Sequence, residues 1–167
     1  MLGLKYITFL YKSTNEHGVH SPFVYDFLTK GIYTTEGSKT TIKGQQKPGK
    51  GEQIYTKIAS YFKFKSVFPT KPSQENDSYD AVILNFKTPL DFHLKLGNNT
   101  TCFILFDPNN ILNKSLWKQM QSHPMLHVTI DLFYIGIAFK RPQQKKEHFV
   151  LAPYKTLTAF IFEKIKF

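Results

Sequence analysis

Apolar residues recur at helical spacing in several segments of the chain. In residues 22–30 an apolar face follows Ser21 and Pro22. This pair is typical of a helix start, because the serine hydroxyl caps the first turn and proline needs no N–H partner there. Gly31 is expected to end this helix, since glycine is the commonest residue just beyond a helix C-terminus. The same spacing predicts three more helices, over residues 2–12, 52–62 and 113–122.

Continuous apolar runs predict strands that are buried on both faces of a sheet. Two such runs are YDAVILNF (79–86) and TTCFILFDP (100–108), and KSVFP (65–69) is a shorter one. LHVTIDLFYIGIAFKR (126–141) is interpreted as two strands joined by a tight turn near residues 133–136, and EHFVLAP (147–153) as a last strand or extended arm. Helices that alternate with apolar strands and close in a hairpin predict an α/β sheet with an antiparallel end.

The length of 167 residues and an apolar fraction of 41% favour one domain over the whole chain, 1–167. Within it we expect an N-terminal helical segment (1–33), a basic loop (34–51), a reduced α/β core (52–153) and a C-terminal extension (154–167). The loop assignment rests on four glycines, one proline and a single aliphatic residue, Ile42.

The chain carries 22 basic and 12 acidic residues, a net charge of +10. Such a field attracts nucleic acid, an acidic lipid surface or an acidic protein, although a merely solvated basic surface explains it equally well. All basic residues except Arg141 are lysines, which disfavours sequence-specific DNA recognition because bidentate base contacts use arginine. The predicted surface for an anionic partner consists of Lys39, Lys43, Lys47, Lys50, Lys57, Lys63, Lys65 and Lys71.

Cys102 is the only cysteine, so no disulfide can form within the chain and a reducing compartment is expected. No apolar run approaches the roughly 18 residues that a membrane span requires. The first 12 residues contain a lysine within their apolar stretch and no small-residue cleavage site. The sequence therefore predicts a cytoplasmic protein without a transmembrane segment.

Two places in the sequence are candidates for chemistry. His17 and His20 bracket Gly18 and are candidate metal ligands. The alternative is a turn in which Gly18 adopts an unusual backbone angle and the imidazoles bond to nearby backbone. Asp107 follows an apolar strand, where ligands bind in open α/β sheets, and is a candidate cofactor contact. Its alternative is an Asp-Pro-Asn turn, and spacing identifies no catalytic nucleophile with a nearby base.

Four stretches of the sequence carry a resemblance to a known family. HGVHSPFVYDFLTKGIY, YTKIASYFKFKSV, WKQMQSHPMLHVTIDLFYIGIAFKR and QKKEHFV resemble a Bacteroidetes-type family of class I S-adenosylmethionine-dependent methyltransferases. The resemblance covers most of residues 5–151. It implies an N-terminal helical segment followed by a Rossmann-like sheet that ends in a reversed hairpin.

The chain departs from that family where the family holds its cofactor. In the family, the strand that matches KSVF leads into an acidic residue and a glycine-rich turn. Here PTKPSQENDS follows and leads directly to YDAVILNF, the counterpart of a much later strand. About two strand–helix units are absent, Asn85 replaces an aspartate, and only Asp107 is retained. We therefore expect a truncated Rossmann-like methyltransferase sheet in which S-adenosylmethionine binding is lost.

These observations favour a non-catalytic, methyltransferase-like binding or assembly subunit for a protein or acidic macromolecule. The alternatives are an S-adenosylmethionine-dependent methyltransferase with a reduced site and a basic module that binds nucleic acid or the ribosome. The strand at 65–68 is expected to be a sheet edge open to a partner strand or a second copy. The extension 154–167 is expected to form a helix that covers the core, docks a partner or lies on a membrane.

Overall fold

The computed structural model describes residues 2–34, 48–70 and 78–155. The chain divides into two compact units, Met1–Lys63 with Val150–Phe167, and Phe64–Phe149. The organisation as a single domain, 1–167, stays a prediction. The predicted helix of the extension 154–167 falls almost wholly outside the described residues.

The first unit is built from short helices. They are α1 (Leu2–Lys12), a 3-10 turn η1 (Glu16–Gly18), α2 (Pro22–Asp26), a π-helical continuation η2 (Phe27–Ile32) and α3 (Lys50–Phe62). The predicted start at Ser21 is confirmed, because its hydroxyl accepts a hydrogen bond from the Val24 N–H at 3.5 Å. Residues Lys50 and Gly51, expected in the basic loop, already belong to α3.

The prediction that Gly31 ends the second helix is wrong. The chain continues in wider π turns, and the Tyr33 N–H donates to the carbonyl of Leu28 at 2.9 Å. Gly31 lies within these turns at a close approach to α3, where a Cβ would stand 3.1 Å from the Tyr61 ring. The glycine therefore allows tight packing between η2 and α3 and does not serve as a cap.

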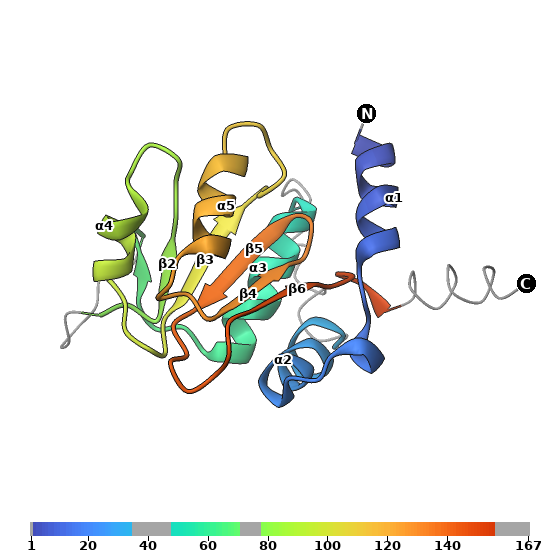
Figure 1. Cartoon of the computed structure of the whole chain (residues 1–167), viewed down its shortest axis with the longest axis horizontal. Helices are drawn as coiled ribbons and strands as arrows, with labels where there is room; N and C mark the ends of the chain where they lie inside the picture. The colour runs from blue at the N-terminus through green and yellow to red at the C-terminus, as the bar shows by residue number, and fades with distance from the viewer. Residues whose placement is uncertain (1, 35–47, 71–77, 156–167) are drawn as a thin grey trace, which may run out of the picture. The chain divides into compact units, whose positions relative to one another are not determined.

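The second unit contains a mixed sheet (Figure 1). Its described strands are β1 (Val67–Phe68), β2 (Ala81–Ile83), β3 (Cys102–Phe106), β4 (Val128–Asp131), β5 (Ile135–Phe139) and β6 (Glu147–Val150), in the order β1-β2-β3-β5-β4-β6. The pairs β1/β2 and β2/β3 are parallel, and β5 is antiparallel to both β3 and β4. The predicted α/β sheet with an antiparallel end and a terminal hairpin is confirmed.

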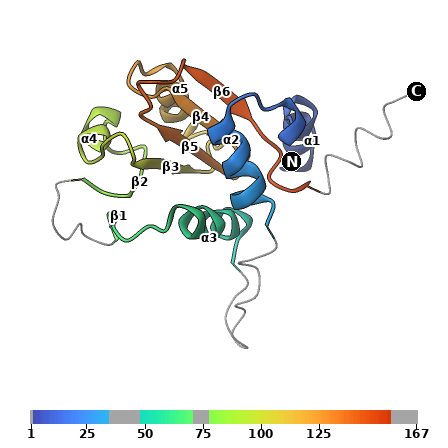
Figure 2. The same ribbon diagram turned by 90° about the horizontal axis from the view of Figure 1, so that it is seen from below.

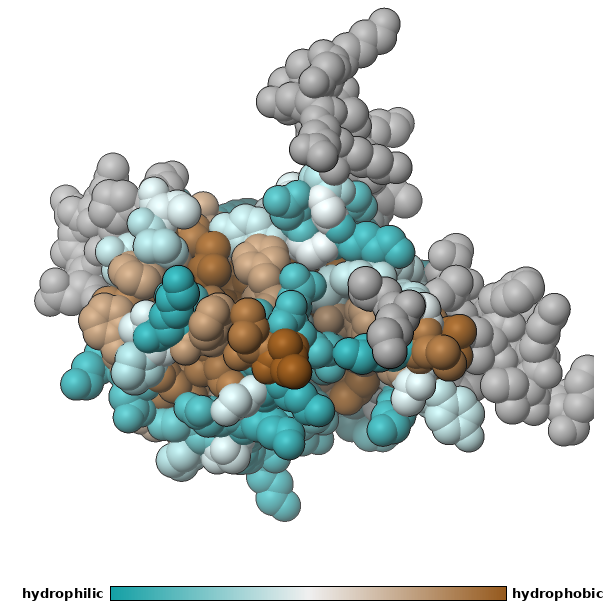
Figure 3. Space-filling view, turned by 90° about the horizontal axis from the view of Figure 1, so that it is seen from above, coloured by the Kyte–Doolittle hydropathy of each residue, from teal (hydrophilic) through white to brown (hydrophobic). Residues whose placement is uncertain are grey.

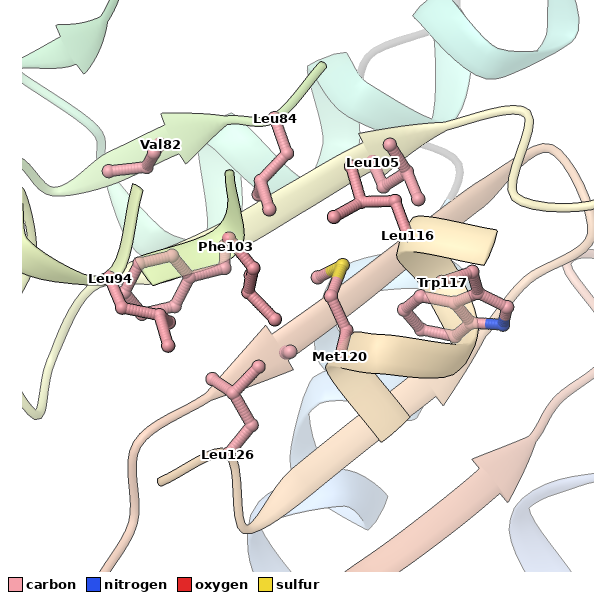
Figure 4. Close-up of a cluster of buried hydrophobic side chains, with 11 residues drawn as sticks. Val82, Leu84, Leu94, Phe103, Leu105, Leu116, Trp117, Met120 and Leu126 are labelled. Carbon is pink, nitrogen blue, oxygen red and sulfur yellow. The ribbon is translucent and has the colours of Figure 1, made fainter. Parts of the chain in front are cut away.

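Two helices, α4 (Leu90–Lys95) and α5 (Lys114–Ser122), lie on one face of this sheet (Figure 2). Leu116 and Met120 of α5 point toward Leu105 and Phe103 of β3, and Trp117 is buried in the same cluster (Figure 4). The cluster also contains Val82, Leu84, Leu90, Leu94, Leu126 and Ala138. Alternate residues of each strand thus face α4 and α5, as the two-residue repeat of a strand requires.

The helix α4 was not predicted from the sequence, because it is short and its stabilising group lies far along the chain. The buried Lys140 ammonium donates to the carbonyls of Leu94 at 2.6 Å and Gly97 at 2.8 Å. It therefore satisfies carbonyls that the end of α4 leaves without a helical partner. Burial lowers the pKa of Lys140.

The strand β1 lies at one end of the sheet, as expected for an edge. The Ser66 carbonyl accepts from the Ala81 N–H, so Ser66 faces β2 and the Val67 N–H points away from it. The Asp80 carboxylate, just before β2, accepts hydrogen bonds from the N–H groups of Lys65 (2.8 Å) and Ser66 (2.9 Å), just before β1. These bonds hold the starts of the two strands together. Burial alone would raise the pKa of Asp80, but these hydrogen bonds outweigh it and lower that pKa. Pairing of this edge with another chain stays a prediction.

Two findings bear on the expected location of the protein. Cys102 is a free cysteine buried in β3, and burial raises the pKa of its thiol. Among the helices of the described segments, none has both the length and the apolarity that crossing a membrane demands.

Candidate functional site

A cleft lies at the carboxyl edge of β2 and β3 in the second unit. Its volume is about 290 Å³. Ligands of open α/β sheets bind at this edge, outside the carboxyl ends of parallel strands. One wall is the loop after β2 and the other is the start of α5 with the turn before it; both loops lie at the top of Figure 1. The lining residues are Phe86, Lys87, Thr88, Pro89, Leu90, Leu112, Ser115, Leu116 and Gln119.

The first wall is shaped by Asn85. Its side-chain oxygen accepts from the Lys87 N–H at 3.0 Å and from the Thr88 hydroxyl at 3.2 Å, which folds the loop into a tight turn. The Asn85 side chain is therefore occupied in holding this turn. The turn leaves Phe86 47% exposed at the cleft.

The second wall begins at Asp107, whose φ of 45° is left-handed. Its N–H donates to the Tyr134 carbonyl at 2.9 Å, and its carbonyl accepts from the Asn110 N–H at 2.9 Å. Asn113 donates to the Phe106 carbonyl at 2.9 Å and secures the end of β3. Asp107 thus starts a turn, as its alternative interpretation held. Its carboxylate is exposed and has no hydrogen bond or ion pair within the described residues.

Exposed apolar side chains occur in both walls of this cleft. Ile111 is 88% and Leu112 57% exposed, and both follow directly from the turn after β3. Lys87 and Lys114 are exposed on the same two walls. We call Phe86, Lys87, Ile111, Leu112 and Lys114 the cleft surface. Figure 3 looks onto the face at the top of Figure 1 and shows apolar side chains exposed among hydrophilic ones. Such a surface favours a ligand that offers both apolar area and negative charge.

A buried carboxyl group, that of Asp131, lies at the same edge of the sheet, at the end of β4. The Asp131 carboxylate accepts from the Phe133 N–H at 2.8 Å and holds the β4–β5 turn, in which Phe133 has a φ of 68°. Burial raises the pKa of Asp131 to about 6, although the Phe133 hydrogen bond and the nearby Trp117 indole act against this. The indole N–H itself is buried without a hydrogen-bond partner in the described structure. Asp131 therefore has a structural role, as a turn cap.

His17 and His20 are both exposed in the first unit. Within the described segments, no third histidine, cysteine, aspartate or glutamate joins them in a cluster suited to a metal. The expected unusual backbone angle at Gly18 is wrong, since its φ is not left-handed. Gly18 is needed for space instead, because a Cβ there would collide with the Thr14 hydroxyl. The Asn15 side chain caps the turn by accepting from the His17 N–H at 3.1 Å.

The predicted lysine surface is only partly described, since Lys39, Lys43, Lys47 and Lys71 lie outside the described residues. Lys57 is not available to a partner, because its ammonium donates to the carbonyls of Ile32 at 2.8 Å and Thr34 at 2.9 Å. Burial lowers the pKa of Lys57. Lys50 lies 5.8 Å from the centre of the Tyr6 ring. Lys63 and Lys65 are exposed.

Sequence reasoning did not find Phe86, Ile111 and Leu112. The signal that identifies them is an apolar residue inside a polar turn that directly follows a buried strand, as in NFKTP (85–89) and NILN (110–113). Turns of this kind are normally polar, so such residues mark a contact surface.

No family model matches this chain. No curated protein and no solved structure matches it either.

Proposed function

We propose that this chain is a non-catalytic binding or assembly subunit with a methyltransferase-like fold, and that its partner docks at the cleft surface. The sheet supports the fold proposal. Three parallel strands are followed by a hairpin whose second strand, β5, lies antiparallel between β3 and β4. This arrangement agrees with the reversed hairpin that the sequence resemblance implies.

The connection between β1 and β2 supports the proposed loss of the cofactor. S-adenosylmethionine would need backbone N–H groups at a close-approach glycine turn and a carboxylate for its ribose. Residues 69–80 contain no glycine. Only residues 69–80 separate β1 from β2 in the sequence, too few for the further strand–helix units that the family has there. Without these groups, a few apolar contacts would have to offset the whole cost of ordering the ligand.

The observation that carries the proposal is the exposed apolar and basic character of the cleft surface. Fully burying a side chain such as Phe86, Ile111 or Leu112 contributes roughly 1.5–3 kcal/mol each. A cleft of about 290 Å³ accommodates an anchoring side chain of a partner, the arrangement found at the centre of protein interfaces. Lys87 and Lys114 favour acidic residues beside that anchor. The proposed partner is therefore a protein segment that is apolar on one side and acidic on the other, in the cytoplasm.

Capture from an extract of the source cells, with matched variants of the full chain, tests this function. We expect Leu112→Gln and Phe86→Gln each to reduce the recovered partner about tenfold, since each removes over 1.4 kcal/mol of apolar contact. Met125→Gln is the control, because Met125 is similarly exposed (49%) but follows the other end of α5. Cross-linking would locate the acidic segment of the partner at the cleft. Equal recovery by all three variants contradicts the proposed docking site.

A further inference from the structure

The outer side of α1 carries an apolar stripe in the first unit. Leu4, Ile7 and Tyr11 are 77%, 63% and 76% exposed. Their spacing of three and four residues aligns them along the length of the helix. Phe9 and Leu10, on other sides of α1, are buried. The helix is therefore already anchored, and the stripe is a second apolar surface for which solvent exposure is unfavourable.

The last described residues of the chain are fixed next to the end of α1. The Thr14 N–H donates to the Val150 carbonyl at 2.9 Å, and the Ala152 N–H donates to the Thr14 carbonyl at 3.2 Å. Lys155 forms an ion pair with Glu16 at 3.6 Å. The chain beyond Lys155 therefore leaves within a few residues of Lys12, where α1 ends.

The sequence beyond Lys155 is suited to cover this stripe. Residues 156–167 read TLTAFIFEKIKF, and six of these twelve residues are large and apolar. As a helix, twelve residues would extend about 18 Å, close to the roughly 16 Å of the eleven-residue α1. A segment that turns back at Lys155 would therefore run antiparallel to α1 and reach Leu4.

We propose that the outer stripe of α1 is the docking surface of residues 156–167 of the same chain. The tether at Lys155 holds the segment beside the stripe at an effective concentration of about millimolar or more. A separate partner at lower concentration is at a disadvantage against it. This inference concerns the first unit and is independent of the cleft surface.

Disulfide trapping in the full chain tests this docking. We pair Ile7→Cys with Ile161→Cys, and use Lys5→Cys with Ile161→Cys as the control because Lys5 is exposed on a different side of α1. Cys102 does not interfere, since it is buried and its thiol pKa is raised. In dilute protein the Ile7 pair should form an intramolecular disulfide about tenfold faster than the Lys5 pair.

Any other outcome overturns the inference. Disulfide-linked dimers would assign the stripe to a second copy, and equal or absent trapping would leave it to a partner protein or a lipid surface.

A second measurement is the rate at which chymotrypsin cleaves within 156–167. Leu4→Gln combined with Ile7→Gln should raise this rate about tenfold by releasing the segment, while Lys5→Gln, on a different side of α1, should not. These positions are exposed, so the variants retain the fold.

Discussion

Replacing Gly136 with alanine is expected to cost the protein about 2–3 kcal/mol of folding free energy. Gly136 lies in β5 directly under the Trp117 ring, and an added Cβ would stand 2.7–2.9 Å from the ring atoms Cζ3, Cη2 and Cε3. The ring cannot move aside freely, because Trp117 is buried beside Leu116 and Met120 of α5. Alanine therefore forces α5 away from the sheet. Urea unfolding followed by circular dichroism measures the loss.

Gly3→Ala is the matched control, because nothing lies within 4 Å of a Cβ at that position and alanine favours the helix. It should leave stability unchanged or raise it slightly. Replacing Trp117 with phenylalanine should restore part of the stability of Gly136→Ala, since the smaller ring makes room. If Gly136→Ala were as stable as the unchanged protein, the packing of α5 on β5 described above would be incorrect.

Replacing Asp131 with asparagine is expected to stabilise the protein by about 3 kcal/mol at pH 8 and to have little effect at pH 3.5. The pKa of Asp131 is raised from 3.8 to about 6 by burial. The contribution of Asp131 to the free energy of unfolding is therefore complete below pH 3.8 and is lost as the pH rises through 6. The carboxyl group must then ionise in an apolar setting. Asparagine keeps the oxygen that accepts from the Phe133 N–H and carries no charge.

Melting temperatures of both proteins between pH 3.5 and pH 8 measure this difference. Asp107→Asn is the control, because the Asp107 carboxylate is exposed and free of partners in the described structure. Its melting curve should follow that of the unchanged chain at every pH. A difference between Asp131→Asn and the unchanged protein that did not vary with pH would show that Asp131 ionises normally.

Local signals in the sequence predicted much of the fold. The Ser21-Pro22 cap, the apolar runs of β2 and β3 and the turn between β4 and β5 depend on neighbouring residues, so they are visible without tertiary information. The helix α4 was missed because Lys140, which caps it, is distant in sequence. The end of the second helix was wrongly predicted at Gly31. A glycine is needed there for close packing against Tyr61, and not for backbone freedom at a helix end.

The candidate site was less predictable than the fold. Asp107 was a candidate because it directly follows an apolar strand. The sequence gave no indication that the Asn85 side chain would instead hold a turn. Lys57 was counted with a free basic surface, although its ammonium binds two backbone carbonyls. Both errors have one cause, since a polar residue in a sequence does not reveal whether its hydrogen bonds are satisfied within the chain.

The central claim is our proposal that this chain has a methyltransferase-like fold and does not hold the methyl donor. Calorimetric titration of the full chain with S-adenosylmethionine, and separately with its demethylated product, tests it most directly. The account predicts no heat of binding for either ligand, because no glycine follows β1 to supply close-approach N–H groups. A micromolar dissociation constant, abolished by Asp107→Ala, would contradict the account and indicate a methyltransferase with a reduced site.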